Sequence, residues 1–361
     1  MGSGKRGLLT AALTVVCAVT VLAAPGTAFA APAPIPAPAP TPAPAVTPLP
    51  DKDLEAVRVR LDKLYHDASV ATDAYNAAEE KAKKQSAEIA ELARKIDQGQ
   101  RRLDGLKDQA GAAARDQYRT NGLSSTARFL LTDDPGRFLD GAGRVLQGQR
   151  AASGLMSEMT RAQKELRAYS DDASAQWKRL ESNRKAKAAA KRKIEQRIDA
   201  AEKLQSRLEE KEKERLAQLE REAARKAQTA WLDTGVLKDA PGQASAPGEK
   251  AVKYAAAQLG KPYVWGAEGP DSFDCSGLTS QAWAAAGHPV PRTSQEQWRQ
   301  LPHVDVEDMR PGDLVIYFDD ASHVALYIGD GTVIHAPRPG RTVTEAGAGS
   351  MPILGVVRPD A

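Results

Sequence analysis

The sequence reads Phe273-Asp274-Cys275-Ser276-Gly277-Leu278 and continues through residues 279–286 to Gly287. Small and apolar residues follow the cysteine at helical spacing, and Gly287 stands where a helix commonly ends. The pattern predicts a helix that carries Cys275 in its first turn, with Asp274 or Ser272 as the N-cap residue. The helix dipole and free N–H groups there lower the pKa of a thiol and favour the nucleophilic thiolate. The stretch therefore predicts a cysteine nucleophile; the alternative is a small buried residue that packs a helix against a sheet.

The chain has 361 residues, which is enough for two domains. Residues 1–30 combine Lys5-Arg6, an apolar run and Ala28-Phe29-Ala30, a pattern typical of a cleaved secretory signal peptide rather than a retained membrane anchor. Cleavage removes Cys17, so we expect a secreted protein with Cys275 as its single cysteine and no internal disulfide. The 50 basic and 47 acidic residues nearly balance, which argues against a nucleic-acid-binding protein.

Two long helical patterns precede the cysteine domain. Residues 31–50 alternate Ala and Pro, which predicts an extended polyproline II spacer with no core of its own. From Asp51 to about Gly111, apolar residues recur in alternating steps of three and four, which indicates a coiled-coil helix. A second, less regular seam predicts another long helix from about Gly141 to Ala230. We expect residues 51–235 to form an antiparallel hairpin; a parallel dimer is the competing geometry.

The junction between the two helical patterns contains turn residues. Asn121-Gly122 and Asp133-Asp134-Pro135-Gly136 interrupt the heptads and predict a short-helix tip at about residues 121–141. Phe129 and Phe138 lie in short apolar pieces of this segment. The simpler interpretation is a small core at the tip; the alternative is an exposed apolar patch that binds a partner.

The C-terminal part of the chain has a different organisation. Residues 236–248 are rich in Gly, Pro, Ala and Ser, which predicts a linker before a domain at 249–361. A helix over Ala251–Leu259 and the cysteine helix come first, and strand-like runs follow at Leu314–Phe318, His323–Ile328 and Thr332–Ala336. Helices before an antiparallel meander favour an α+β domain with a small antiparallel sheet. The predicted fold class is therefore multi-domain, a long all-α coiled-coil hairpin followed by an α+β domain.

Two histidines lie on neighbouring predicted strands, and the turn between the strands decides whether they meet. A three-residue Gly329-Asp330-Gly331 turn with a bulge puts His335 diagonal to His323 on one face, whereas a two-residue turn separates them. We predict the three-residue turn, with both imidazoles facing the cysteine helix. Cys275 would then attack a carbonyl carbon, His323 would take the thiol proton and give it to the leaving amine, and His335 would orient His323. The N–H of Cys275 would help to hold the oxyanion.

Other interpretations of these residues stay open at this point. A strand histidine is commonly a structural residue that forms hydrogen bonds. A zinc site made from Cys275 and the two histidines is the other alternative, but zinc sites usually have more thiols or a carboxylate at ligand spacing. Neither stands out in the sequence. We therefore expect no metal ion and no cofactor.

Six motifs of the C-terminal domain resemble, in order, those of the NlpC-type cysteine peptidases, which are papain-like bacterial cell-wall endopeptidases. The motifs are Pro262-Tyr263-Val264-Trp265-Gly266, Phe273-Asp274-Cys275-Ser276-Gly277-Leu278, Pro291-Arg292-Thr293-Ser294, Pro311-Gly312-Asp313-Leu314-Val315, His323-Val324-Ala325-Leu326-Tyr327-Ile328-Gly329 and Ile334-His335-Ala336-Pro337. The resemblance implies a papain-like fold with Cys275 as nucleophile, His323 as base and His335 as the third polar residue. It also implies supporting or substrate-binding roles for Tyr263, which the family places beside the nucleophile, and for Trp265, Asp274, Ser276 and Arg292.

The same resemblance implies a substrate. The family usually cuts peptidoglycan stem peptides between γ-D-glutamate and a diamino acid, often meso-diaminopimelate. The helical segment, in turn, resembles the regulatory hairpins of division-associated cell-wall hydrolases, some of which respond to a membrane ABC-transporter complex. That second resemblance implies that the hairpin occludes the site until a partner bound at the tip pulls it away.

The sequence thus predicts a secreted, wall-associated cysteine endopeptidase that its hairpin regulates. The first alternative is an amidase or acyltransferase on a related papain-like fold. The second is a structural coiled-coil wall protein whose C-terminal module is inactive. The complete set of Cys275, His323 and His335 argues against this second alternative.

Overall fold

The structure is a computed structural model that describes residues 49–119, 135–237 and 242–361. The predicted signal peptide, nearly all of the predicted spacer and most of the predicted tip lie outside the described residues. The described residues belong to one compact unit. Within these ranges, no helix is long and apolar enough to cross a membrane.

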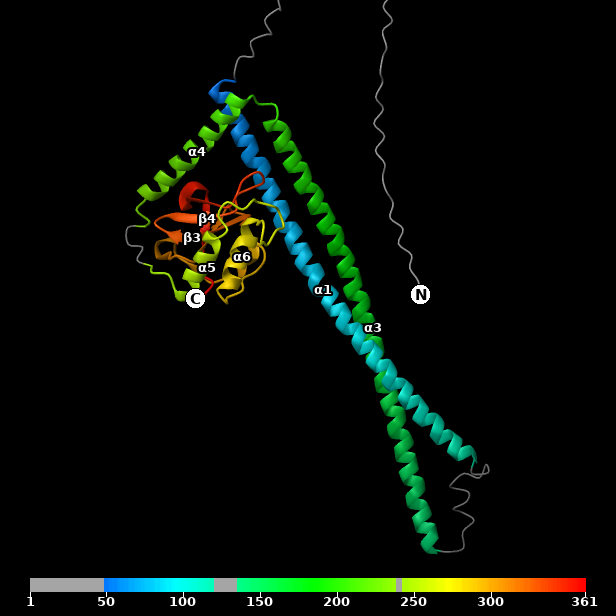
Figure 1. Cartoon of the computed structure of the whole chain (residues 1–361). Coiled ribbons are helices and arrows are strands. Elements are labelled where there is room, and N and C mark those ends of the chain that lie inside the picture. The colour runs from blue at the N-terminus through cyan, green and yellow to red at the C-terminus, as the bar shows by residue number, and fades with distance from the viewer. Residues whose placement is uncertain (1–48, 120–134, 238–241) are drawn as a thin grey trace, which may run out of the picture. The chain divides into compact units, whose positions relative to one another are not determined.

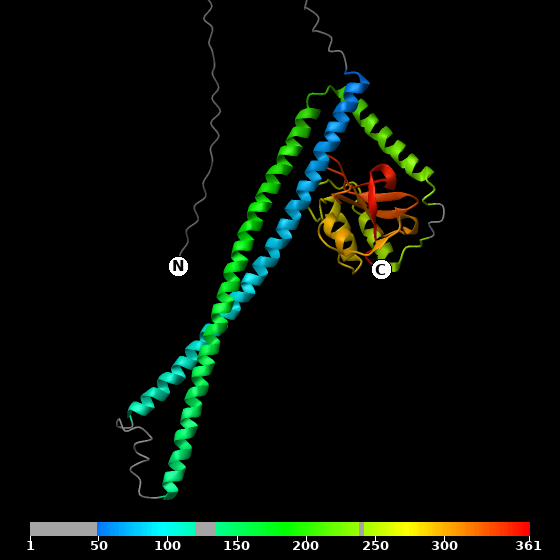
Figure 2. The same ribbon diagram turned by 180° about the vertical axis from the view of Figure 1, so that it is seen from behind.

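The N-terminal part of the described chain is a helical hairpin. Its long helices are α1 (Asp51–Arg119) and α3 (Pro135–Gln205). The two helices lie side by side (Figure 1), and Figure 2 shows the same pairing from behind. Leu54 and Leu61 near the start of α1 pack with Ala201 near the end of α3, whereas Leu103 far along α1 packs with Ala162. The pairing is therefore antiparallel, and the expected hairpin is confirmed.

The second helical pattern is interrupted, contrary to the prediction from the sequence. A helix over 141–230 was predicted, but α3 ends at Gln205 and α4 (Glu210–Asp233) begins after a short break. Glu209 and Glu212 form a capping box, in which the Glu212 carboxylate accepts a hydrogen bond from the Glu209 N–H at 2.9 Å. Such reciprocal bonds satisfy N–H groups that a new helix start leaves free. The continuous helix was therefore a wrong prediction, because local capping at Glu209 starts a new helix.

The C-terminal part contains three helices and a six-stranded sheet among its described residues. The helices are α5 (Ala246–Ala256), α6 (Cys275–Ala285) and α7 (Ser294–Gln300). The strands are β1 (His303–Val304), β2 (Leu314–Tyr317), β3 (His323–Gly329), β4 (Thr332–His335), β5 (Thr344–Gly347) and β6 (Ile353–Val357). Their order is β1-β6-β2-β3-β4-β5, and all neighbours are antiparallel. The three expected strands form the β2–β4 meander, and the α+β class is confirmed.

The two faces of the sheet are covered by different parts of the chain. On one face, Leu278 and Trp283 of α6 pack with Leu326 in a fully buried core, and α5 joins them. On the other face, Tyr327 packs with Trp231 of α4. This second contact is close, because a Cβ on Gly349 would lie 2.4 Å from the Cβ of Trp231. The last helix of the predicted hairpin segment therefore completes the packing of the sheet.

The nucleophile helix has its own close contact, and it gives the first testable prediction. A Cβ on Gly277 would lie 2.2 Å from the carbonyl oxygen of Ala267, so Gly277→Ala forces the backbone to move. We expect a loss of about 1–3 kcal/mol in the free energy of unfolding, measured by thermal unfolding with tryptophan fluorescence.

Gly154→Ala is the matched control, because nothing lies within 4 Å of a Cβ at this position in α3. It should be neutral or stabilise the protein by up to about 1 kcal/mol. Equal melting temperatures for the two variants would contradict the contact between Gly277 and Ala267.

Candidate active site

The thiol lies at the start of a helix, as the sequence predicts. Cys275 is the first residue of α6, and Asp274, not Ser272, is the N-cap residue. The Asp274 carboxylate accepts a hydrogen bond from the Gly277 N–H at 2.7 Å, a common N-cap contact. The thiol is free, and only 4% of Cys275 is exposed. The candidate nucleophile is therefore in place but shielded from solvent.

The two histidines meet at one face of the sheet. His323 begins β3 and His335 ends β4, and Nε2 of His323 lies 2.9 Å from Nδ1 of His335. Both residues are buried. This distance is within hydrogen-bond range, so one ring can fix the orientation of the other.

The turn between these strands is shorter than expected. β3 ends at Gly329 and β4 begins at Thr332, which leaves the two residues Asp330 and Gly331, both with positive φ. Two central residues with positive φ are typical of a tight hairpin turn. The predicted three-residue turn is therefore wrong.

The histidines still share a face because the register shifts in β3. An irregularity between Tyr327 and Gly329 adds a residue on that strand, and Leu326 pairs with Ile334. This is the register that the sequence analysis expected from a longer turn. A bulge inside the strand thus has the same effect as an extra residue in the turn.

The imidazoles are neutral in this arrangement. Burial lowers the pKa of His323 well below its ordinary value, and the neighbouring His335 lowers it further. Burial lowers the pKa of His335 to about 4. At neutral pH neither ring carries a charge, so His323 is in the form that accepts a proton.

The pKa of the Cys275 thiol differs from the prediction. Burial raises the pKa of Cys275 well above its ordinary value, and the carboxylates of Asp274 and Asp73 raise it further. The backbone N–H groups of Val324 and Ser276 lower it, but by less. A thiolate was expected from the helix N-terminus alone. The correction is that loss of water around a buried group outweighs the helix effect, so the thiol is protonated here.

Asp274 organises the surroundings of the nucleophile. Its fully buried carboxylate accepts hydrogen bonds from the Gly266 N–H at 2.9 Å and from both terminal nitrogens of Arg292, at 3.0 and 2.7 Å. The Arg292 Nη1 also donates to the Ser276 hydroxyl at 3.0 Å. The structure therefore brings together Asp274, Ser276 and Arg292, three of the residues that the sequence analysis placed in supporting or substrate-binding roles.

Two further predicted site residues lie on the segment before α6, and both contact α1. Tyr263 is buried, and its pKa is raised by burial first and then by the nearby Cys275, while a hydrogen bond with Thr72 opposes the rise. Trp265 is half-buried, and its ring meets the ring of Tyr75 edge to face at 5.2 Å. Both residues therefore join the candidate site to the hairpin.

A buried polar face of α1 was not predicted from the sequence. Thr72, Asp73 and Asn76 are 3%, 4% and 2% exposed, so this face is as buried as a core. The Asp73 carboxylate accepts hydrogen bonds from the Ser294 hydroxyl at 3.0 Å and the Gln295 amide at 2.8 Å. Asn76 donates to Asp274 at 3.0 Å. Spacing at three and four residues was the available signal, but polar residues on one helix face ordinarily indicate solvent.

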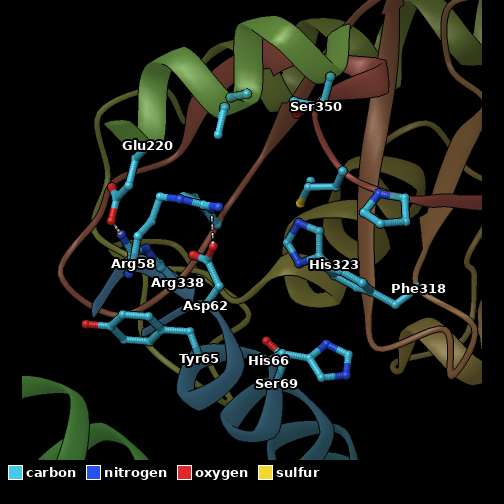
Figure 3. A pocket seen from close by; sticks show the side chains of 16 residues that line it. Arg58, Asp62, Tyr65, His66, Ser69, Glu220, Phe318, His323, Arg338 and Ser350 are labelled. Atoms are coloured by element: carbon cyan, nitrogen blue, oxygen red, sulfur yellow. Dashed lines mark hydrogen bonds and ion pairs between the residues drawn. The ribbon is translucent and has the colours of Figure 1, made fainter. Parts of the chain in front are cut away.

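A cavity of about 460 Å³ lies beside His323. Its walls come from α1, from α4 and from the C-terminal domain, and Figure 3 labels Arg58, Asp62, Tyr65, His66 and Ser69 on α1, Glu220 on α4, and Phe318, His323, Arg338 and Ser350. The hairpin segment therefore encloses the space next to the candidate base. Within the part of the chain that the structure describes, no three His, Cys, Asp or Glu side chains are grouped as metal ligands.

Comparison with known proteins gives one family. Residues 260–351 match the model of the NlpC/P60 family. A probable endopeptidase of Corynebacterium glutamicum is 42% identical over 137 residues, which cover 38% of this chain and 65% of the relative. The probable endopeptidase p60 of Listeria monocytogenes is 45% identical over 80 residues, which cover 22% of this chain and 16% of the relative. The crystal structure of the NlpC/p60 domain of the peptidoglycan hydrolase SagA is 31% identical, with 31% of this chain and 97% of that chain covered and a TM-score of 0.29. The chain spans less than two thirds of the length of these curated relatives.

The pairing of Asp274 with Arg292 gives a second prediction. Arg292→Ala leaves the Asp274 carboxylate buried without its guanidinium partner. We expect the free energy of unfolding to fall by about 3–5 kcal/mol, measured by urea unfolding.

Arg299→Ala tests an exposed ion pair of the same region, since Arg299 contacts Glu296 at the surface. Its expected effect is about 0–1 kcal/mol. Similar losses in the two variants would show that burial of the Asp274 charge does not determine stability here.

Proposed function

The C-terminal domain of this chain belongs to the NlpC/P60 family, and from that premise we propose that the protein is a peptidoglycan endopeptidase with Cys275 as its nucleophile. One observation carries the proposal: the matched segment contains a thiol at a helix N-terminus and two histidines 2.9 Å apart. A thiol, a base and a third group that orients the base form the usual arrangement for cysteine nucleophiles. The curated relatives, whose names call them probable endopeptidases, support the same activity.

The proposed reaction has two steps. His323 takes the proton of Cys275, and the sulfur attacks the carbonyl carbon while the N–H at the start of α6 stabilises the oxyanion. The C–N bond then breaks, His323 gives its proton to the leaving amine, and a thioester remains. Water, deprotonated by His323, hydrolyses the thioester and releases the acid and the thiol. His335 holds the His323 ring throughout by the bond at 2.9 Å.

The sequence resemblance supports a specific substrate and place of action. We propose that the bond cleaved joins D-glutamate to the diamino acid of the stem peptide. We also propose that the protein acts outside the membrane on the cell wall, because residues 1–30 have the pattern of a signal peptide. Contact between the tip and a transporter-type division complex stays a prediction, since most of 121–141 lies outside the described residues.

We propose further that the hairpin keeps the enzyme inactive in the arrangement described here. Thr72, Asp73 and Asn76 of α1 contact Tyr263, Ser294 and Asp274 around the nucleophile, as given above. In this closed arrangement Cys275 is shielded from solvent, and its raised pKa makes loss of the thiol proton to His323 more costly. Withdrawal of α1 would return water to the site, which lowers the pKa of Cys275.

The experiment for the activity uses the full chain, because Trp231 of α4 completes the sheet and a shorter fragment would expose that face. Asp73→Arg combined with Asn76→Arg puts two cations against Arg292 and opens the site. We expect this opened variant to cut purified stem peptides after D-glutamate, at least about tenfold faster than the parent chain, with products identified by mass spectrometry.

Cys275→Ala in the opened variant is the control and should form no product. Intact stem peptides with the opened variant would contradict the peptidase assignment. Cleavage between the sugar and the first amino acid would instead favour the amidase alternative. Equal rates for the opened variant and the parent chain would contradict inhibition by the hairpin.

Asp73 gives closure a pH dependence. In the closed arrangement burial raises its pKa from 3.8 to about 8; Asp274 raises it too, whereas the bonds from Gln295 and Ser294 and the charge of Arg292 oppose the rise. The closed form therefore holds a proton that the open form releases. Protonated Asp73 stabilises the closed form relative to the open form. This stabilisation is fully present below about pH 4 and is lost as the pH rises to about 8.

Asp73→Asn removes this titration and keeps the shape of the side chain. We expect the ratio of the parent rate to the Asp73→Asn rate to rise severalfold per pH unit between about pH 4 and 8, measured on one stem peptide in matched buffers. In the open form Asp73 has moved away from Cys275, so the titration of Cys275 and His323 there is the same in both proteins and cancels in the ratio. A constant ratio over this range would contradict the role of Asp73.

A further inference from the structure

Glu220 of α4 is held by two arginines of the C-terminal domain. Its Oε1 lies 2.7 Å from Nη2 of Arg338, and its Oε2 lies 2.6 Å from Nη2 of Arg341. Each carboxylate oxygen therefore receives its own guanidinium, a geometry that binds carboxylates strongly. Glu220 and Arg338 are 18% and 15% exposed at their side chains, so this pair is largely shielded from water.

Arg338 is incompletely paired in this arrangement. Its Nη1 is buried and has no hydrogen-bond partner among the described residues. The guanidinium also lies over the ring of Tyr65 on α1, 4.2 Å from the ring centre, which holds its plane in position. A buried N–H without a partner costs free energy, so the pairing with Glu220 leaves the Arg338 guanidinium only partly satisfied.

The arginines lie beside the candidate catalytic histidines. Arg338 lines the same cavity as His323 (Figure 3). A second hollow, of about 350 Å³, is lined by His335 together with Arg338 and Arg341. In the proposed reaction His323 protonates the leaving amine, so the residue that carries this amine must lie next to His323. That residue then lies at the cavity that His323 shares with Arg338.

We propose that Arg338 and Arg341 form the binding site for the side-chain carboxylate of the diamino acid, and that Glu220 occupies this site in the closed arrangement. The inference rests on the proposed function, because that function supplies the leaving amine. It names the substrate class: stem peptides whose third residue carries a free side-chain carboxylate, as diaminopimelate does and lysine does not. Glu220 then acts as an internal competitor for the same two guanidinium groups.

Binding is measured separately from cleavage. The protein is the full chain with Cys275→Ala, with and without Glu220→Gln, and the probes are L-Ala-γ-D-Glu-X-D-Ala peptides. X is meso-diaminopimelate, its side-chain carboxamide, or lysine, so every peptide keeps the other carboxylates. We expect Glu220→Gln to tighten binding of the diaminopimelate peptide about tenfold by calorimetry, because the competing charge is removed.

The matched controls separate the site from general charge effects. Glu222→Gln changes an acid on the same helix that pairs with Arg215 instead, and it should leave binding unchanged. In the Glu220→Gln protein, Arg338→Gln or Arg341→Gln should weaken binding of the diaminopimelate peptide about tenfold or more. Neither change should affect binding of the carboxamide and lysine peptides.

The inference is overturned by equal binding of the three peptides, by losses on Arg338→Gln that are the same for all three, or by no binding with Glu220→Gln. An effect of the arginines on the carboxamide peptide as well would assign them to the terminal carboxylate, which also overturns it. Cleavage of the opened variant distinguishes the two proposals. Cleavage after D-glutamate without selectivity for X would leave the proposed function standing alone, whereas selective binding without cleavage would reject that function and keep the carboxylate site.

Discussion

The carboxylate of Asp274 joins four parts of the molecule through hydrogen bonds. It accepts from the first turn of α6, from the Gly266 backbone, from Arg292 and from Asn76 of α1. A buried charge is tolerated only when such partners surround it, so each of these segments has one position that satisfies the carboxylate. The residue that sets the start of the nucleophile helix therefore also sets where the hairpin docks. Position of the thiol and closure of the site depend on the same group.

Most of the chemistry could be predicted from local sequence. A cysteine that follows an N-cap residue and precedes a helical run can only lie at a helix start, and Cys275 does. The pairing of His323 with His335 follows from strand periodicity once the register is known. The register was right although the turn was wrong, because a bulge near Gly329 replaces the missing turn residue. Turn length is a weak predictor where glycine permits either geometry.

What could not be predicted depends on contacts between distant segments. Asp73 and Asn76 read as solvent-exposed residues of a long helix, and only docking against Ser294 and Asp274 makes them buried. The prediction of a low pKa for the Cys275 thiol was wrong for the same reason. A helix N-terminus is visible in the sequence, but burial by other elements is not. Likewise, nothing in the α4 sequence indicates that Trp231 packs on the sheet, because an apolar residue there fits the hairpin seam equally well.

The order of the segments along the chain has a consequence for the history of each molecule. The ribosome makes α1 and α3 before it makes α6. The hairpin that packs beside Cys275 is therefore synthesised before Cys275 itself. Domains generally fold as units, with the N-terminal one first during synthesis. In that order the hairpin pairs first, and the sheet and α6 are completed against it. If the hairpin were encoded after the catalytic residues, the sheet and α6 would be made before the helices that pack against them.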